Sequence, residues 1–196
     1  WGEEMNIASK IIRVLTIPPI IAFLMVVILF QAMGNDFGTM RDFILALVFL
    51  VLLPSLGYPL QRIIPFFKEK GREGQRLLAM IHAVLGYIFG TVYAFCIGAM
   101  PLFRIIFLTY LLSGIQIMLF NKVFQLKASG HACGVTAPFI VLSTLSKYFL
   151  GVGIVLIIFV YASSLKIKRH SIGQLIGGST ISIVSYLVSS FMVGII

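Results

Sequence analysis

The chain has 196 residues, of which 60% are hydrophobic and 11% are charged, and its mean hydropathy is +1.08. A soluble domain carries roughly 25% charged residues, so this composition excludes an ordinary soluble protein and indicates an integral membrane protein. Fifteen Lys and Arg against six Asp and Glu give a net charge of +9. The basic residues gather between apolar runs, which favours a role in membrane topology or in binding a phosphate-bearing ligand over nucleic-acid binding.

Apolar segments follow one another at about residues 14–33, 42–60, 76–98, 102–120, 131–146, 148–164 and 171–194. Crossing about 30 Å of hydrocarbon takes roughly 20 helical residues, and backbone in lipid must satisfy its own hydrogen bonds, so helices are expected. The fifth and sixth segments are short and are separated only around Lys147. The sequence therefore predicts an all-α integral membrane protein, a bundle of six or seven transmembrane helices in one polytopic domain over residues 1–196.

Basic residues are divided unevenly between the two sides of the predicted bundle. With seven spans, twelve of the fifteen Lys and Arg fall on the side of the N-terminus, before residue 14 and within 60–76, 121–130 and 165–170. Arg41, Arg104 and Lys147 fall on the other side. The positive-inside rule then places the N-terminus and the four basic segments in the cytoplasm. A count of six spans would move the last of these loops to the opposite side.

The polar stretch KASGH, Lys127 to His131, precedes the fifth apolar segment. Ser129 and Gly130 are turn and N-cap residues, so a helix is expected to begin at about His131. The unpaired N–H groups and the dipole of a helix N-terminus favour an anion, and Lys122 and Lys127 lie just before it. This pattern suits a phosphate group, and the alternative is a capped helix with lysines that reach the lipid headgroups.

A second polar stretch, SSLKIKRHS from Ser163 to Ser171, repeats the arrangement. His170 precedes another predicted helix, and Ser171 to Gln174 fits a capping box. Two predicted helices separate the two stretches, so both histidines are expected on the same face of the membrane. Three cations stand just upstream of the second histidine, namely Lys166, Lys168 and Arg169. Two helix starts, two histidines and up to five cations could enclose a phosphoryl group.

Together the two stretches resemble the membrane type 2 phosphatidic acid phosphatase family, which is related to glucose-6-phosphatase and the vanadium haloperoxidases. That family carries Lys-x6-Arg-Pro, then Pro-Ser-Gly-His, then Ser-Arg-x5-His-x3-Asp. Here Ser129-Gly130-His131 matches the second motif, and Ser163 and His170 match the third at its spacing. The resemblance covers residues 101–196 and identifies their four predicted helices with the phosphatase core.

The resemblance implies that His170 is the nucleophile that forms a phosphohistidine and that His131 is the general acid for the leaving alkoxide. It implies a reaction in which cations and helix dipoles, and no metal or other cofactor, stabilise the developing charge. The implied phosphate-binding residues are Lys122, Lys127, Ser129, Gly130, Lys166 and Arg169.

The chain departs from these motifs at several positions. Ala128 replaces the Pro, and no Arg-Pro precedes it; Ser164 stands where the motif has Arg, and Gln174 stands where it has Asp. An amide can orient His170 but cannot neutralise its positive charge, and the analogous Asp to Asn change in a serine protease costs about 10⁴ in rate. Lys166, Lys168 or Arg169 could replace the missing Arg. The candidates for orienting a histidine are Gln174 and Glu73, and the loop that holds Glu73 also offers Arg72 and Arg76 to phosphate.

The expected function is dephosphorylation of a lipid phosphate or pyrophosphate at the membrane surface, on the cytoplasmic face. Phosphatidate, phosphatidylglycerol phosphate and polyprenyl pyrophosphate are all open as substrates. The expected partners are a phosphorylated lipid and the surrounding membrane lipids, without nucleic acid. One alternative is a catalytically impaired relative that binds or transports a phosphorylated lipid. Another is a structural membrane subunit whose basic loops only set topology.

Overall fold

The computed structural model describes the backbone of residues 2–195 and the side chains of residues 7–195 except that of Lys122. Within this range all regular elements are helical. In chain order they are α1 (Gly2–Leu15), α2 (Pro18–Met33), the short 3-10 helix η1 (Gly34–Asp36), α3 (Met40–Leu47), the π-helix η2 (Val48–Leu52), α4 (Leu53–Leu60), α5 (Pro65–Glu69), α6 (Gly71–Cys96), α7 (Pro101–Lys122), α8 (Gly130–Leu142), α9 (Lys147–Lys166) and α10 (Ile172–Val193).

Six stretches of the described chain are long and apolar enough to cross a membrane, which confirms an all-helical, multi-pass membrane protein. They cover Pro18–Asp36, Met40–Leu60, Gly71–Cys96, Pro101–Asn121, Lys147–Lys166 and Ile172–Val193. The fifth predicted segment, 131–146, forms only the 13-residue α8. At 1.5 Å per residue such a helix spans about 20 Å, less than the hydrocarbon layer. The long helices therefore number six.

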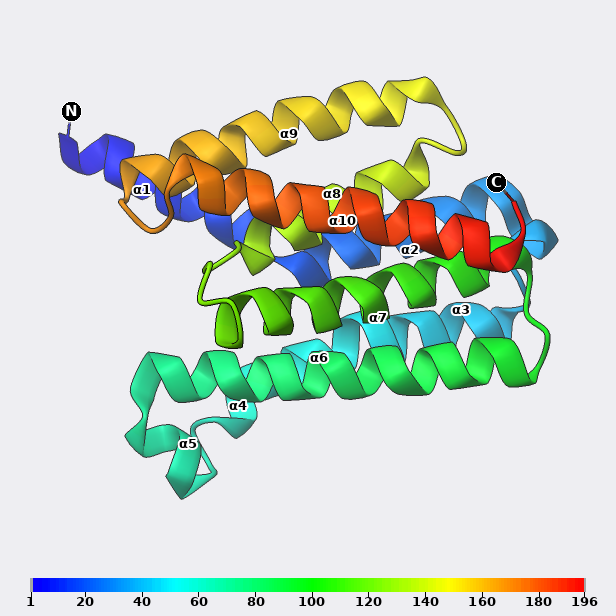
Figure 1. The fold of residues 1–196 in the computed structure, drawn as a ribbon, viewed down its shortest axis with the longest axis horizontal. Coiled ribbons are helices and arrows are strands. Elements are labelled where there is room, and N and C mark those ends of the chain that lie inside the picture. The colour runs from blue at the N-terminus through cyan, green and yellow to red at the C-terminus, as the bar shows by residue number, and fades with distance from the viewer. Residues whose placement is uncertain (1, 196) are drawn as a thin grey trace.

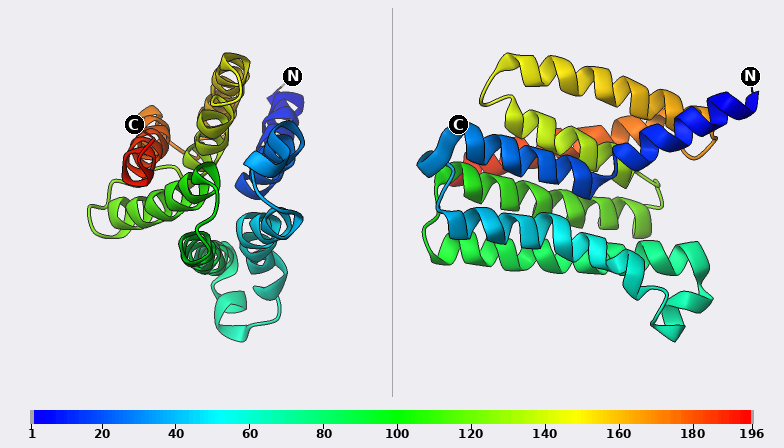
Figure 2. Two further views of the ribbon diagram at one scale, coloured as in Figure 1. Left: turned by 90° about the vertical axis from the view of Figure 1, so that its right-hand side faces the viewer. Right: turned by 180° about the vertical axis from the view of Figure 1, so that it is seen from behind.

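Helix α8 lies in the middle of the bundle, where α2, α9 and α10 pack around it (Figure 1). Most of its residues are buried. It runs antiparallel to α9, so the chain still passes between the two ends of the bundle before α9 begins (Figures 1 and 2). The α9–α10 loop consequently lies at the same end as the α7–α8 loop.

The two ends of the bundle differ in charge. Helix α1, the connection from α4 to α6, the α7–α8 loop and the α9–α10 loop all lie at one end, which we call the basic end (Figures 1 and 2). These are the four segments that carry most of the Lys and Arg. The α2–α3, α6–α7 and α8–α9 connections lie at the other end, beside the last residues of α10. Which end faces the cytoplasm stays a prediction of the positive-inside rule.

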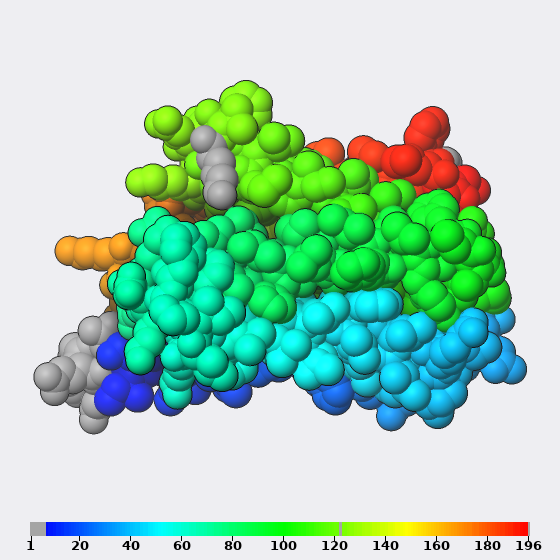
Figure 3. Space-filling model, turned by 90° about the horizontal axis from the view of Figure 1, so that it is seen from below, coloured from blue at the N-terminus to red at the C-terminus, as the bar shows by residue number. Residues whose placement is uncertain are grey.

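The N-terminal segment turns sharply before the first span. Pro18 and Pro19 begin α2, and because proline lacks an N–H and is favoured in the first turn of a helix, α1 ends at Leu15 and a new helix starts. Helix α1 then lies across the basic end, packed against α9. Seen from below, α6 covers the bundle, flanked by α3 and α4 on one side and by α7 on the other (Figure 3).

Candidate functional site at the basic end

His170 lies in the α9–α10 loop, one residue before the N-cap Ser171. The predicted capping box forms: the N–H of Gln174 donates to Ser171 Oγ at 3.4 Å, and the N–H of Ser171 donates to Gln174 Oε1 at 3.3 Å. The same Oε1 lies 3.0 Å from His170 Nδ1. Because a backbone N–H can only donate, the atom facing it is the amide oxygen, so Nδ1 of His170 carries the hydrogen. The neutral ring therefore keeps its lone pair on Nε2.

His131 is the second residue of α8. The buried N-cap Ser129 accepts the N–H of Ala132 at 3.3 Å and so fixes the first turn. His131 Nε2 lies 3.0 Å from Thr16 Oγ1. Since the Thr16 hydroxyl donates to the carbonyl of Ile12 at 2.7 Å, it accepts from the imidazole, and Nε2 of His131 carries the hydrogen.

One residue, Gln174, joins the two polar stretches. Its side chain holds His170, and its backbone carbonyl accepts the N–H of Ser129 at 2.8 Å. The approach of α10 to the start of α8 requires Gly178, because a Cβ there would overlap the carbonyl oxygen of Ser129. The first turns of α8 and α10 are thus held together, with His131 in the first turn of α8 and His170 just before the N-cap of α10.

Four arginines from separate parts of the chain gather at this end: Arg13 and Arg169 lie near both histidines, Arg76 lies near His170, and Arg72 lies near Arg169. Arg13 comes from the last turn of α1, Arg72 and Arg76 from the start of α6, and Arg169 from the α9–α10 loop. Arg13 Nη1 donates to the buried Ser164 Oγ at 2.7 Å. Within the described side chains, none of these arginines forms an ion pair with a carboxylate. Among the described side chains, the positive charge of the cluster is therefore not balanced by a carboxylate.

Burial and the neighbouring arginines both favour the neutral form of the two histidines. Burial, aided by the positive charges of Arg13 and Arg169, lowers the pKa of His131 to about 4. Burial also lowers the pKa of His170, helped by the charges of Arg13, Arg76 and Arg169 and opposed by the hydrogen bond from Gln174. Burial and the neighbouring arginines likewise lower the pKa of the Arg13 guanidinium. Titratable groups whose pKa values are shifted by burial and by neighbouring charges mark a candidate functional site.

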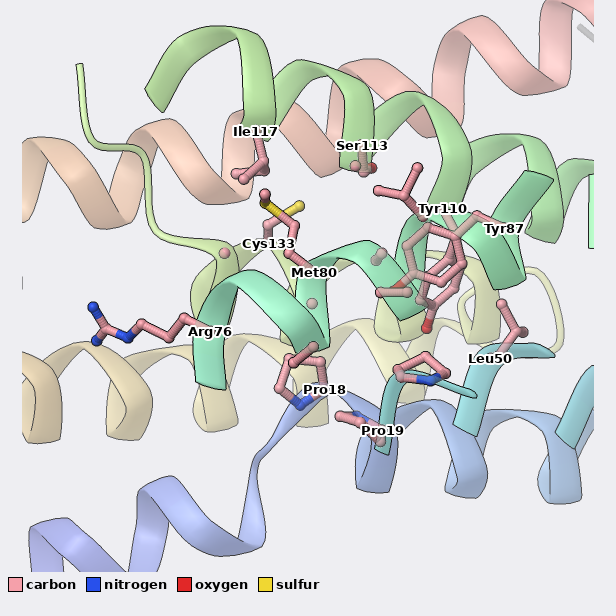
Figure 4. A pocket seen from close by; sticks show the side chains of 18 of the residues that line it. Pro18, Pro19, Leu50, Arg76, Met80, Tyr87, Tyr110, Ser113, Ile117 and Cys133 are labelled. Carbon is pink, nitrogen blue, oxygen red and sulfur yellow. The ribbon is translucent and has the colours of Figure 1, made fainter. Parts of the chain in front are cut away.

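Two cavities adjoin this cluster. The first, which we call the basic cleft, has a volume of about 670 Å³ and is lined by Lys10, Arg13, Val14, Arg72, Lys166, Ile167, Lys168 and Arg169. The second, the apolar cavity, has a volume of about 280 Å³ and lies between α2, α4, α6, α7 and α8. Its lining includes Gly130 and Arg76 near the histidines. Figure 4 shows Arg76 at one side of the apolar cavity and Tyr87, Tyr110 and Leu50 at the other, with Met80 and Cys133 between them.

The remaining predicted site residues lie at the same end in different settings. Gly130 begins α8, and a Cβ there would meet no atom within 4 Å. Lys166 is exposed at the end of α9 and lines the basic cleft. Lys127 is exposed in the α7–α8 loop with a φ of 46°. Glu73 is exposed in the first turn of α6, and no hydrogen bond or ion pair joins it to either histidine. The side chain of Lys122 lies outside the described residues.

Sequence reasoning missed Arg13 and Thr16. Arg13 counted only toward topology, and Thr16 stood inside an apolar segment. They are three residues apart, and each contacts one of the polar stretches. Their partners Ser164 and His131 are more than one hundred residues away along the chain, so no local spacing could reveal these contacts.

No group of three or more His, Cys, Asp or Glu side chains that could hold a metal ion is found among the described residues. Comparisons of the chain with protein-family models, with curated proteins and with solved structures give no match. The chemistry of this site therefore rests on its own geometry.

Proposed function

We propose that the protein is a membrane lipid phosphate phosphatase, similar to the type 2 phosphatidic acid phosphatases, that acts through a phosphohistidine. The observation that carries this proposal is that Gln174 joins the starts of α8 and α10, so that His131 and His170 lie beside arginines for which the described side chains give no carboxylate partner. One of them, His170, has its Nδ1–H engaged by Gln174. Its Nε2 lone pair is the nucleophile in the proposed reaction.

In the first step Nε2 of His170 attacks phosphorus, an N–P bond forms, and the bond from phosphorus to the lipid oxygen breaks. The lowered pKa of His170 keeps the ring in its unprotonated, nucleophilic form at neutral pH. Water then attacks the phosphohistidine, the N–P bond breaks, and inorganic phosphate leaves. Gln174 orients the ring in both steps, but as an amide it leaves the positive charge of the phosphohistidine without a counter-charge.

His131 is the proposed proton donor to the leaving lipid oxygen and the base for the attacking water. Its pKa of about 4 makes it neutral at pH 7. A bound phosphate brings negative charge beside the ring, which raises the pKa and favours proton uptake. Protonation of His131 is therefore coupled to substrate binding.

Charge stabilisation in the transition state comes from the arginines and from the two helix starts. The transferred phosphoryl group spreads its negative charge over its non-bridging oxygens. Preorganised cations and N–H groups that meet this charge lower the barrier, and each such donor contributes about 10²–10³ in rate. In this proposal Arg169 and the first turns of α8 and α10 supply these groups.

The apolar cavity supports a lipid substrate. Its lining is mostly apolar, and one side of it is formed by Arg76 and by Gly130, the residue before His131. A headgroup at the basic end would leave a hydrocarbon chain to enter this cavity between the helices. Cytoplasmic placement of the basic end is part of the same proposal and rests on the positive-inside rule.

The second candidate function is binding or transport of a phosphorylated lipid without hydrolysis. Gln174 favours it, because the arginine cluster can hold an anion even if an amide does not sustain turnover. Both candidate functions require binding of a phosphorylated lipid, but only the phosphatase releases inorganic phosphate.

The test is phosphate release by the purified protein in lipid bilayers with EDTA present, against a panel of lipid phosphates. Wild type is compared with His170→Ala, with His131→Ala and with the matched control His82→Ala. His82 lies within α6, where its Nδ1 is 2.9 Å from the carbonyl oxygen of Leu78. We expect release by wild type and by the His82 variant, and a loss of about 10²-fold or more in the two site variants. Radiolabelled substrate should also leave an acid-labile phosphoryl label on wild type and none on His170→Ala. Binding without any release from wild type would identify a binding or transport protein.

A further inference from the structure

Helix α1 brings a cation into the site from outside both polar stretches. It lies across the basic end, packed against α9 (Figures 1 and 2). Arg13 in its last turn donates to Ser164 Oγ at 2.7 Å, and Ser164 is fully buried near the end of α9. Thr16, three residues later, holds His131. The end of α1 therefore contacts the second polar stretch through one residue and the first through another.

The charge balance around Arg13 is incomplete. The guanidinium is half-buried, and the partner that the described structure gives it is a neutral hydroxyl. The charged groups near it are Arg76 and Arg169, which repel it. Holding a cation partly out of water beside other cations is unfavourable unless an anion completes the site. A phosphate dianion would supply the missing charge.

The guanidinium also has donors to spare. Nη1 donates to Ser164, and the remaining N–H groups of the guanidinium can donate to two oxygens of one phosphate. The charge of Arg13 acts on both His131 and His170. It therefore lies near the nucleophile and near the proton donor at once.

We propose that Arg13 binds the non-bridging oxygens of the transferred phosphoryl group, so that α1 is a part of the active site. This inference rests on the proposed function. Ser164 stands at the position where the related motif has Arg, and its hydroxyl holds Arg13 in place. The cation that α9 lacks at this position is thus supplied by α1, from the other end of the sequence.

The experiment is a charge relocation. Arg13→Gln removes the cation, Arg13→Lys keeps the charge without the planar group, and the double variant Arg13→Gln with Ser164→Arg returns the cation to α9. Arg62→Gln is the matched control, because Arg62 is an exposed arginine of the same end that does not line the basic cleft. The readouts are kcat and KM for lipid phosphate and equilibrium binding of radiolabelled inorganic phosphate.

We expect Arg13→Gln to lose about 10²–10³ in kcat/KM and at least tenfold in phosphate affinity. We expect the kcat/KM of Arg13→Lys to lie between those of wild type and Arg13→Gln. The kcat/KM of the double variant should be at least tenfold higher than that of Arg13→Gln, which a merely structural defect would not allow. Arg13→Gln within twofold of wild type, or a double variant no better than Arg13→Gln, would overturn the inference and leave the phosphatase proposal standing. A wild type without turnover refutes the proposed function instead. In that case, loss of phosphate binding in Arg13→Gln but not in Arg62→Gln still identifies Arg13 as an anion-binding residue.

Discussion

Replacing Gly178 by Ala should separate the two first turns that present the histidines. A Cβ at residue 178 would overlap the carbonyl oxygen of Ser129 and would lie 3.0 Å from its carbonyl carbon and 3.3 Å from Ala132 Cβ. The obstructing atoms belong to the backbone, so no side-chain rotation can relieve the clash. Helix α10 must move away from the start of α8, and the 2.8 Å bond between the Ser129 N–H and the Gln174 carbonyl must stretch.

Two opposing contributions set the change that Gly178→Ala makes in the free energy of unfolding. Ala is favoured over Gly within a helix by about 1 kcal/mol, whereas overpacking a close contact costs about 1–3 kcal/mol. The expected net change is a loss of about 1 kcal/mol in the free energy of unfolding. The effect on function should be larger than the effect on stability. A displacement of about 1 Å between reacting groups costs roughly 10²-fold in rate.

The matched control is Gly177→Ala, one residue earlier on α10. The nearest atom to a Cβ at that position is Ala128 Cβ at 3.9 Å, an ordinary contact. This variant should be as stable as wild type or more stable, with unchanged phosphate release. Thermal unfolding in detergent and phosphate release in bilayers measure both effects. If Gly178→Ala matches Gly177→Ala in stability and in turnover, the close approach of α8 and α10 does not set the site.

The sequence predicted the features that depend on composition or on neighbouring residues. Hydropathy identified the long helices, because an apolar stretch of about 20 residues has few other stable states in lipid. The caps at Ser129 and Ser171 were predictable, since an N-cap bond joins residues two or three positions apart. The four basic segments were expected on one side, and the structure places them at one end of the bundle.

The length of α8 was not predictable from hydropathy alone. The apolar run was expected to continue to residue 146, but the helix ends at Leu142. Ser143 Oγ donates to the Ile140 carbonyl at 2.6 Å, and Thr144 Oγ1 donates to the Val141 carbonyl at 2.7 Å. Hydroxyls that bond nearby carbonyls compete with helix hydrogen bonds, and here they accompany the turn toward α9.

The contribution of α1 to the site could not be predicted from the sequence, because it depends on residues that are far apart along the chain. Arg13 and Ser164 are 151 residues apart. A basic residue before a span indicates topology, and Ser164 in place of the motif Arg does not indicate which residue lies against it. The packing of α1 on α9 brings the two residues into contact.

Three further predictions concern the same end of the bundle. Gln174→Glu keeps the length of the side chain and its bonds to His170 and Ser171 and adds a negative charge. This variant should raise the pKa of His170, measured by NMR titration, and should raise kcat at least tenfold, with about 10⁴ as the upper bound. An unchanged kcat would show that the lack of a negative charge at residue 174 does not limit the reaction. Ala83→Phe places a ring in the apolar cavity that Ala83 lines; it should lower kcat/KM for long-chain lipid phosphates at least tenfold and leave kcat/KM for a short water-soluble phosphomonoester unchanged. The control is Leu85→Phe, on the exposed side of α6. Equal losses on both substrates would argue against a lipid chain in the cavity. The last prediction follows from the pKa of about 4 of His131. The folded protein holds this ring neutral, whereas the unfolded chain binds a proton below its ordinary pKa of about 6.5. The contribution of His131 to stability is therefore complete above pH 6.5 and is lost as the pH falls toward 4, by about 3 kcal/mol in all. The midpoint temperature of thermal unfolding of wild type should then fall more steeply than that of His131→Asn between pH 7 and pH 4.5. Parallel curves would show that burial does not lower the pKa of His131 in this way.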